Sequence, residues 1–426
     1  MRFILCVLFI SIFHVNAQSL YKNKEKEILP GAYQTEKYFP LLLNKRVAVF
    51  ANHTSVIEQT HLVDSLIHSN INVVKIFAPE HGFRGKTSAG EKINNSIDSS
   101  TQIPIISLYG SKLKPSNADL TDVDVMLFDI QDVGVRFYTF ISSLEYFIEA
   151  AIENDRPLII LDRPNPNGFY VDGPVLQKEY KSFVGMQPIP IVYGMTIGEY
   201  AKMLIGEQWL EWKYISDIDN RTSLGELLGF ENEKIFFSLE VISCKNYTHQ
   251  NKYILPIAPS PNLPTMQSVY CYPSTCLFEG TVISEGRGTE HPFCIFGHPK
   301  LPKNLFLFKP QSNVGATNPK FSNEICYGWN LFNVDNDELL KSLNHSIQIK
   351  YLVQAYQMFG NKSSFFVKPK SEKDTDYFFN KLVGSNILMK QLKENKSEKE
   401  IRLSWKKDIE TFKKVRKKYL LYKDFE

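Results

Sequence analysis

Residues 77–85, FAPEHGFRG, bring three chemically active side chains together at the end of an apolar run: Glu80, His81 and Arg84. A carboxylic acid beside apolar residues can have a raised pKa and donate a proton, and a planar guanidinium can pair with a carboxylate. Each residue also has a structural explanation, because histidines are commonly hydrogen-bonded structural residues and glycines 82 and 85 fit tight turns. Whether these residues have a chemical or a structural role depends on the strands and helices that position them.

Five runs rich in Val, Ile, Leu and Phe predict strands that are covered on both faces, at residues 46–51, 71–78, 103–108, 123–130 and 157–162. Apolar residues at helical spacing predict helices at 62–67, at 141–152 with an end near Asn154, and at 196–207. Strands that alternate with helices pair in parallel through right-handed crossovers. The sequence therefore predicts an α/β fold with a doubly wound parallel sheet.

Polar side chains follow all five predicted strands. In open parallel sheets, ligands bind beyond the carboxyl ends of the strands, where loops and helix N-termini converge. Taken alone, each residue has a structural explanation, because an aspartate can cap the next helix and an arginine can neutralise a neighbouring aspartate. The coincidence at five strand ends favours a binding cleft. Its candidate residues are Asn52, His53, Glu80, His81, Arg84, Tyr109, Asp129, Gln131, Arg136, Tyr138, Asp162 and Arg163.

A second domain is predicted from the Pro-rich stretch 255–265 onward, because this stretch cannot continue a helix or a central strand. The chain then divides into a catalytic domain at 18–254 and a smaller α+β domain at 255–426. The second domain has helical patterns around Leu339, at 351–359 and at 376–393, and a basic helix at the C-terminal end. Its own polar, glycine-rich cluster at 279–293 adds the candidates Glu285, Arg287 and Glu290.

The first 17 residues have the pattern of a secretory signal, with an apolar stretch too short to span a bilayer. We therefore expect cleavage near Ala17 and a periplasmic or secreted protein without a membrane span. The net charge of +3 is too balanced to favour nucleic acid as a partner. The sequence has no P-loop, no G-x-G-x-x-G after the first strand, no G-x-S-x-G and no paired C-x-x-C, so we expect neither a cofactor nor a metal. The sequence leaves two alternatives for Cys271 and Cys276, a disulfide between them or buried free thiols.

Carboxylates, arginines and aromatic residues in one cleft suit a polar, uncharged or anionic ligand such as a sugar. Glycoside cleavage needs a protonated acid at the leaving oxygen and a second group that stabilises or attacks the positive anomeric carbon. Glu80, beside an apolar strand end, is the candidate acid.

Eight stretches closely resemble, in this order, the NamZ family of exo-β-N-acetylmuramidases: FAPEHGFRG, SLYG, FDIQDVGVRFYTF, LDRPNPNG, GPVL, SFVGMQPIPIVYGMTIGEYA, APSPNLPT and SEGRGTEHPF. The resemblance runs from about Val47 through the C-terminal helix. It implies a Rossmann-like N-terminal domain, a smaller C-terminal domain and a cleft between them. It also implies a glycosidase that releases N-acetylmuramic acid from the non-reducing end of peptidoglycan glycan fragments, for cell-wall turnover or recycling.

The resemblance places the family's proposed catalytic glutamate, in the E-H-G motif, at Glu80. Our candidates for the second carboxylate are Asp129 and Asp162, with Glu290 in reserve, and the alternative is attack by the substrate's own acetamido oxygen. Tyr193 occupies the position where many relatives have a histidine. In this chain the phenol of Tyr193 must therefore take over any role that the histidine has in those relatives.

The remaining candidates would contact the sugar. A guanidinium should bind its lactyl carboxylate, and tyrosines can stack on its ring. These candidates are Arg84, Arg136, Arg163 and Arg287 for the carboxylate, and Tyr109 and Tyr138 for the ring.

Two other functions stay open at this stage. The chain could be a non-catalytic periplasmic protein that binds muropeptides or glycans, or a hexosaminidase that favours N-acetylglucosamine. Hydrolysis of glycosides with and without the lactyl group separates the three.

Overall fold

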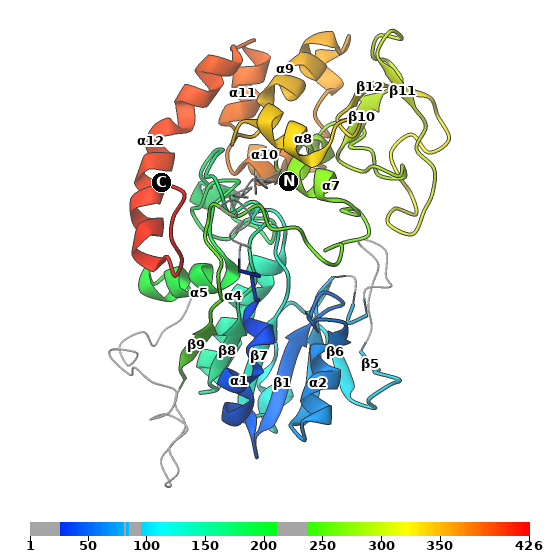
Figure 1. Ribbon diagram of the computed structural model, residues 1–426. Coiled ribbons are helices and arrows are strands. Elements are labelled where there is room, and N and C mark those ends of the chain that lie inside the picture. Colours follow the sequence, from blue (N-terminus) through cyan, green and yellow to red (C-terminus); the bar gives the residue numbers. More distant parts are fainter. Residues whose placement is uncertain (1–25, 81, 85–94, 211–236) are drawn as a thin grey trace, which may run out of the picture.

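The computed structural model describes residues 26–80, 82–84, 95–210 and 237–426. It consists of an α/β lobe with a large sheet and a second lobe made mainly of helices (Figure 1). The predicted signal segment 1–17 and His81 lie outside the described residues.

The α/β lobe is built on a seven-stranded sheet with the order β5-β6-β4-β1-β7-β8-β9, in which all neighbours pair in parallel except β5 and β6. All five predicted strands are present, as β1 (Arg46–Ala51), β4 (Asn72–Ala78), β6 (Pro104–Ser107), β7 (Val125–Asp129) and β8 (Leu158–Leu161). The apolar pattern does not mark the edge strands β5 (Ser96–Ile97) and β9 (Leu239–Ile242), because most of their side chains are exposed or half-buried. A short hairpin joins β2 (Val56–Ile57) and β3 (Thr60–His61).

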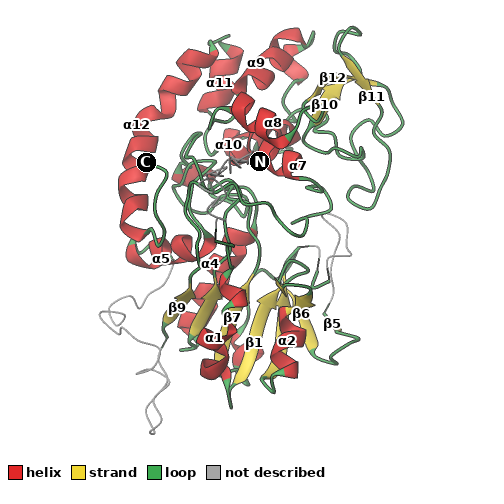
Figure 2. Ribbon diagram, viewed as in Figure 1, coloured by secondary structure: helices red, strands yellow, loops and turns green. Residues whose placement is uncertain are grey.

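Helices cover both faces of the sheet. Val47 and Val49 of β1 share a core with α1 (Thr35–Leu42) and α2 (Leu62–His68). Ala48 and Phe50 point to the other face, where α4 (Phe140–Glu153) and α5 (Ile197–Gly206) pack. Figure 2 shows α1 and α2 in front of the strands. The doubly wound α/β fold and its three predicted helices are therefore confirmed, and α4 ends at Glu153 with Asn154 as its C-cap, close to the expected end. A further short helix is α3 (Asn117–Leu120).

The second lobe combines helices with a small antiparallel sheet of order β10-β12-β11, which confirms the α+β prediction. Gly384, at φ 84°, ends α10, so the single helical pattern at 376–393 forms two helices. The strands are β10 (Ile295–His298), β11 (Phe306–Phe308) and β12 (Cys326–Asn330). The helices are α7 (Met266–Thr275), α8 (Asn336–Leu343), α9 (Ile349–Met358), α10 (Phe378–Val383), α11 (Ile387–Lys393) and α12 (Glu398–Arg416).

One hydrophobic core runs through both lobes, joining side chains of α4 and α5 to those of α7 through α12. After α12 the chain returns to the first lobe, where Leu421 N–H donates to Glu199 Oε1 at 2.8 Å and the Tyr422 hydroxyl donates to Asp162. The two lobes are thus held together by packing and by the C-terminal tail. The domain boundary near residue 254 stays a prediction.

The cysteines at 244, 271, 276, 294 and 326 are all buried free thiols, so the Cys271–Cys276 alternative is not realised. None of the helices in the described part of the chain is both long enough and apolar enough to cross a membrane.

Candidate active site

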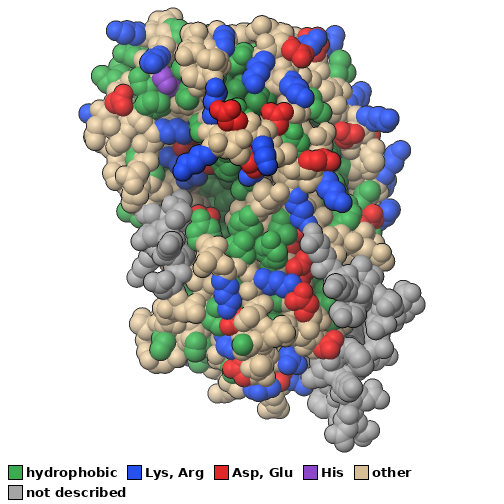
Figure 3. Space-filling view, turned by 180° about the vertical axis from the view of Figure 1, so that it is seen from behind, with side chains coloured by type: hydrophobic (Ala, Val, Ile, Leu, Met, Phe, Trp, Pro, Cys, Tyr) green, Lys and Arg blue, Asp and Glu red, His purple; other side chains and the backbone are tan. Residues whose placement is uncertain are grey.

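A pocket of about 300 Å³ lies between the two lobes, at the carboxyl edge of the sheet. This volume is at the small end for ligand sites and suits a single small ligand. The face shown in Figure 3 is hollowed between the lobes, and hydrophobic side chains gather there. The described residues that line the pocket are Glu80, Tyr109, Phe137, Tyr138, Thr139, Phe140, Phe183, Val184, Ser260, Asn262, Leu263, Tyr272, Cys276, Glu279, Arg287, Phe293, Phe378 and Leu382.

The first polar wall comes from the sheet. Glu80 follows β4, and its Oε1 accepts a hydrogen bond of 2.8 Å from the hydroxyl of Tyr109, which follows β6. Burial, and next the negative charge of Glu80, raise the pKa of Tyr109 above its ordinary value. Tyr109 therefore remains a neutral donor that orients the carboxylate. Beyond β7, the Tyr138 hydroxyl donates to Pro259 O at 2.8 Å, so Tyr138 presents its ring to the pocket from a fixed position.

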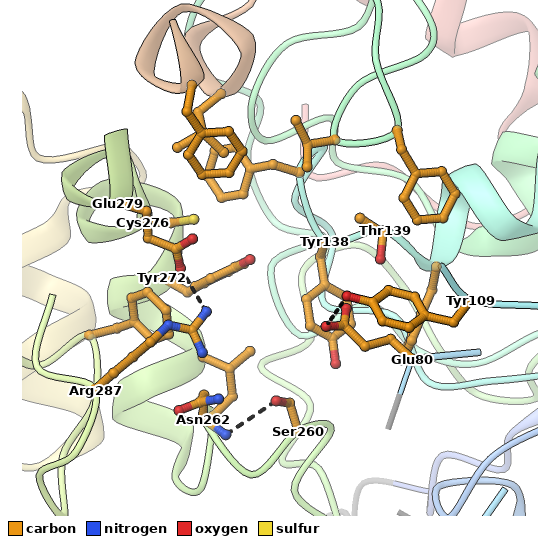
Figure 4. Close-up of a pocket in the computed structure, with 18 residues that line it drawn as sticks. Glu80, Tyr109, Tyr138, Thr139, Ser260, Asn262, Tyr272, Cys276, Glu279 and Arg287 are labelled. Carbon is orange, nitrogen blue, oxygen red and sulfur yellow. Dashed lines mark hydrogen bonds and ion pairs between the residues drawn. The ribbon is translucent and has the colours of Figure 1, made fainter. Parts of the chain in front are cut away.

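The second polar wall comes from the helical lobe. Glu279 lies in the short helix that follows α7, and its Oε1 accepts a hydrogen bond of 2.7 Å from Arg287 Nη2. Burial alone would lower the pKa of Arg287, but the carboxylates of Glu279 and Glu285 raise it above its ordinary value, so the guanidinium stays charged. Figure 4 shows Glu279 and Arg287 on one side of the pocket and Glu80 and Tyr109 on the other.

The rest of the lining divides into an amide and hydroxyl group and an apolar group. Ser260 and Asn262 come from the Pro-rich stretch, and Asn262 Nδ2 is fixed by a 2.6 Å hydrogen bond to Gly315 O. Phe183, Val184 and Phe378 supply apolar surface. A ligand with both hydroxyl groups and an apolar face, such as a substituted sugar, matches this division.

Asp129 and Arg163 form a buried ion pair away from the pocket lining. Arg163 Nε and Nη2 donate to the two carboxylate oxygens of Asp129 at 2.6 and 2.8 Å, and both residues are almost inaccessible to solvent. Both carboxylate oxygens of Asp129 thus accept hydrogen bonds from Arg163, and the two charges neutralise each other.

Asp162 is also buried, and both of its carboxylate oxygens accept hydrogen bonds from surrounding segments. It accepts hydrogen bonds from the hydroxyls of Thr196 and Tyr422 and, at 2.9 Å, from Gly198 N–H. Burial raises the pKa of Asp162 to about 6. Neither aspartate predicted as the second catalytic carboxylate lines the pocket.

Four more candidates at the strand ends support neighbouring loops. Asn52 Oδ1 accepts from Thr54 N–H at 2.9 Å, and Gln131 Nε2 donates to Pro164 O at 2.8 Å. His53 Nε2 lies 2.9 Å from Ala258 O. Arg136 is fully buried, where it donates to the carbonyls of Pro174, Ile189 and Leu382.

Arg84 contacts Asp98 at 3.0 Å and Asp64 at 3.4 Å and is absent from the described lining. Of the four arginines predicted for the lactyl carboxylate, all within the described residues, only Arg287 lines the pocket. Glu285 lies behind Arg287, at 3.5 Å from its Nε, whereas Glu290 is exposed and does not line the pocket.

Tyr193, the departure from the family pattern, is fully buried and donates a hydrogen bond to Asp132. Burial raises the pKa of Asp132 to about 6. Both groups stand behind the pocket, since neither is part of the described lining.

Sequence reasoning missed Glu279, Ser260 and Asn262 as site residues. The signal was present, because APSPNLPT contains Ser260 and Asn262, and the polar cluster 279–293 begins with Glu279. Within the described part of the chain, no three His, Cys, Asp or Glu side chains gather in an arrangement suited to a metal ion.

Two carboxylates on opposite walls of a small pocket, between an α/β lobe and a second lobe, fit the requirement of a glycoside hydrolase for paired acidic groups. The particular family follows from comparison with known proteins. The chain matches the family models described as exo-beta-N-acetylmuramidase NamZ, N-terminal, over residues 47–267 and C-terminal over residues 270–422. It therefore belongs to the NamZ family, as the eight motifs indicate.

Relatives agree with this assignment along nearly the whole chain. The peptidoglycan beta-N-acetylmuramidase NamZ of Bacillus subtilis (strain 168) is 34% identical over 403 residues, which cover 90% of this chain and 89% of the relative. Two solved structures of DUF1343 family proteins from Bacteroides fragilis NCTC 9343 superpose with TM-scores of 0.79 and 0.71, at 46% and 28% identity. Each superposition covers 93% of this chain and 99% of the other.

Proposed function

We propose that this protein is an exo-β-N-acetylmuramidase that releases N-acetylmuramic acid from the non-reducing end of peptidoglycan glycan fragments. The observation that carries the proposal is the placement of Glu80 opposite Glu279 and Arg287 in one small pocket. A pocket of about 300 Å³ has room for one terminal sugar, which fits an exo mode of action.

In this proposal Glu80 protonates the leaving glycosidic oxygen. It follows β4 at the edge of the pocket, and Tyr109 fixes the orientation of its carboxyl group. Phe140 and Phe183 add apolar surface to the same pocket.

Glu279, rather than Asp129 or Asp162, is the carboxylate we assign to the opposite side of the sugar. Its charge can stabilise the positive anomeric carbon directly, or it can orient the acetamido group of the substrate for attack. Arg287 uses one N–H group on Glu279 and has others for the lactyl carboxylate. Ser260 and Asn262 lie where they can hydrogen-bond sugar hydroxyl groups.

The proposed substrate and the N-terminal sequence both bear on the cellular location of the protein. Assembled peptidoglycan lies outside the cytoplasm, and the pattern of the first 17 residues is that of a secretory signal. We therefore propose a periplasmic or secreted location for the enzyme.

The test is hydrolysis of chromogenic β-glycosides by the purified mature protein. The proposal expects release of the chromophore from the N-acetylmuramic acid glycoside, with a higher kcat/KM than from the N-acetylglucosamine glycoside. A muropeptide-binding protein without catalytic activity would release none. Equal or better use of the N-acetylglucosamine glycoside would identify a different hexosaminidase.

A further inference from the structure

Lys320 contacts the segment that carries the second polar wall, although it does not itself line the pocket. Its ammonium, which has three N–H groups, lies 3.0 to 3.3 Å from four backbone carbonyl oxygens of this segment and forms an ion pair of 3.0 Å with Glu285 Oε2. The four carbonyls are those of Phe278, Glu279, Thr281 and Ile283. One lysine thus contacts both the backbone around Glu279 and the carboxylate behind Arg287.

The position of Lys320 is fixed by close packing of two backbone segments. Gly288, directly after Arg287, has φ 79°, and a Cβ atom on it would come within 2.5 Å of Pro319. The turn that carries Arg287 and the segment that carries Lys320 are therefore in direct contact. This approach needs glycine at position 288.

The charges in this cluster explain what Lys320 adds. Arg287 lies between two carboxylates, at 2.7 Å from Glu279 and 3.5 Å from Glu285. Glu285 is buried, with a side chain only 5% exposed, so solvent screens its charge weakly. Without Lys320, a single guanidinium would face two carboxylates, and the wall would carry a net negative charge that repels an anionic ligand.

We propose that Lys320 is a specificity-determining positioning residue: by neutralising Glu285, it leaves Arg287 able to bind a carboxylate on the sugar. The inference rests on the proposed function and names the feature that selects a carboxylate-bearing N-acetyl sugar over a neutral one. A neutral sugar gains little from Lys320, because it brings no charge to the wall.

The experiment compares Lys320→Met with the wild-type protein, using the chromogenic N-acetylmuramic acid glycoside as substrate. Free N-acetylmuramic acid and free N-acetylglucosamine serve as competitive inhibitors. We expect the variant to raise KM and the inhibition constant of N-acetylmuramic acid about tenfold, as for loss of one charge several ångströms away in a protein environment. The inhibition constant of N-acetylglucosamine should change less than about twofold. Lys320→Arg, which keeps the charge, should restore most of the discrimination.

Lys114→Met is the matched control. Lys114 is 28% exposed and pairs with two carboxylates, and Lys320 is 29% exposed, but Lys114 lies away from the pocket. This control should leave both inhibition constants unchanged. The double variant Glu285→Gln with Lys320→Met restores the charge balance without either group. It should therefore recover most of the preference for N-acetylmuramic acid.

Three outcomes would overturn the proposal. In the first, Lys320→Met weakens both sugars equally, which would make Lys320 a purely structural residue; in the second, it weakens neither. In the third, the double variant folds but still does not prefer the anionic sugar, and the effect of Lys320 would then come from its contacts with the carbonyls. If Lys320→Met alone does not fold, the double variant still provides this test. Failure of the proposed function would be distinct, because the wild-type protein itself would not hydrolyse the glycoside.

Discussion

At the end of β4, Glu80 faces the pocket and accepts a hydrogen bond from Tyr109, whereas at the ends of β7 and β8 the carboxylates of Asp129 and Asp162 are buried among their partners. All three positions follow the same rule, that parallel strands deliver side chains to one edge of the sheet. The difference lies in what covers each strand end. An ion pair with Arg163 covers Asp129, the C-terminal tail covers Asp162, and the ligand pocket lies over Glu80. A side chain at a strand end can meet a ligand only where the tertiary structure leaves that end open.

The largest expected effect comes from the open strand end. Glu80→Gln keeps the shape of the side chain and removes its titrating proton, so kcat on the chromogenic glycoside should fall by roughly 10² to 10⁴, the usual contribution of a general acid. The melting temperature should stay unchanged. Glu290→Gln, at an exposed position outside the described lining, is the control and should keep full activity. Near-normal turnover by Glu80→Gln would remove Glu80 as the acid.

The second test concerns the covered end of β7. Asp129→Asn leaves Arg163 buried without a matching charge, so the free energy of unfolding should fall by about 3 to 5 kcal/mol. The kcat of the folded fraction should change only a few-fold. Asp124→Asn breaks the solvent-screened pair with Arg46 and should lower the free energy of unfolding much less. Denaturant titration measures both variants, and a loss of kcat as large as that of Glu80→Gln would make Asp129 catalytic after all.

A smaller effect should follow from removing the partner of Glu80. Tyr109→Phe deletes the hydroxyl that orients the carboxyl group, and the loss of this hydrogen bond to Glu80 should lower kcat/KM about tenfold. Tyr138→Phe loses a hydrogen bond to the Pro259 carbonyl instead, so it should alter stability more than kcat. If the two variants lose the same kcat, orientation of Glu80 is not the role of Tyr109.

The smallest effect is a pH dependence at the covered end of β8. Burial raises the pKa of Asp162 from 3.8 to about 6. Between these values the folded protein keeps a proton that the unfolded chain has lost. The stability that this group contributes is therefore present below about pH 4 and is lost as the pH rises through 6. Asp132, with a pKa that burial also raises to about 6, acts in the same direction.

Asp162→Asn should make the melting temperature fall less between pH 4 and pH 6.5 than it does in the wild-type protein. Part of the decline should remain, because Asp132 is unchanged. Identical pH profiles for both proteins would show that Asp162 does not titrate in this range. Thermal unfolding at four pH values across the interval is the measurement.

The sequence predicted the sheet well because buried parallel strands need continuous apolar runs, and β1, β4, β6, β7 and β8 all have them. It also placed Glu80, Tyr109 and Tyr138 at strand ends that open on the pocket. It could not separate these from Asp129 and Asp162, because the covering residues Arg163 and Tyr422 lie 34 and 260 positions away along the chain.

The second wall was harder to predict for a different reason. Glu279 and Asn262 lie in segments without a long helix or strand, so no periodic pattern indicates where their side chains point. Arg287 was among the four candidate arginines, but its selection needed the pocket. Conversely, Arg136 has a charged side chain in a position that only the fold reveals as fully buried.

The contact between Asp162 and Tyr422 has a kinetic consequence. These residues are 260 positions apart, so this contact of the first lobe cannot form until residue 422 has been synthesised. Closing so long a loop is slow, which delays the last step of folding relative to formation of the local helices.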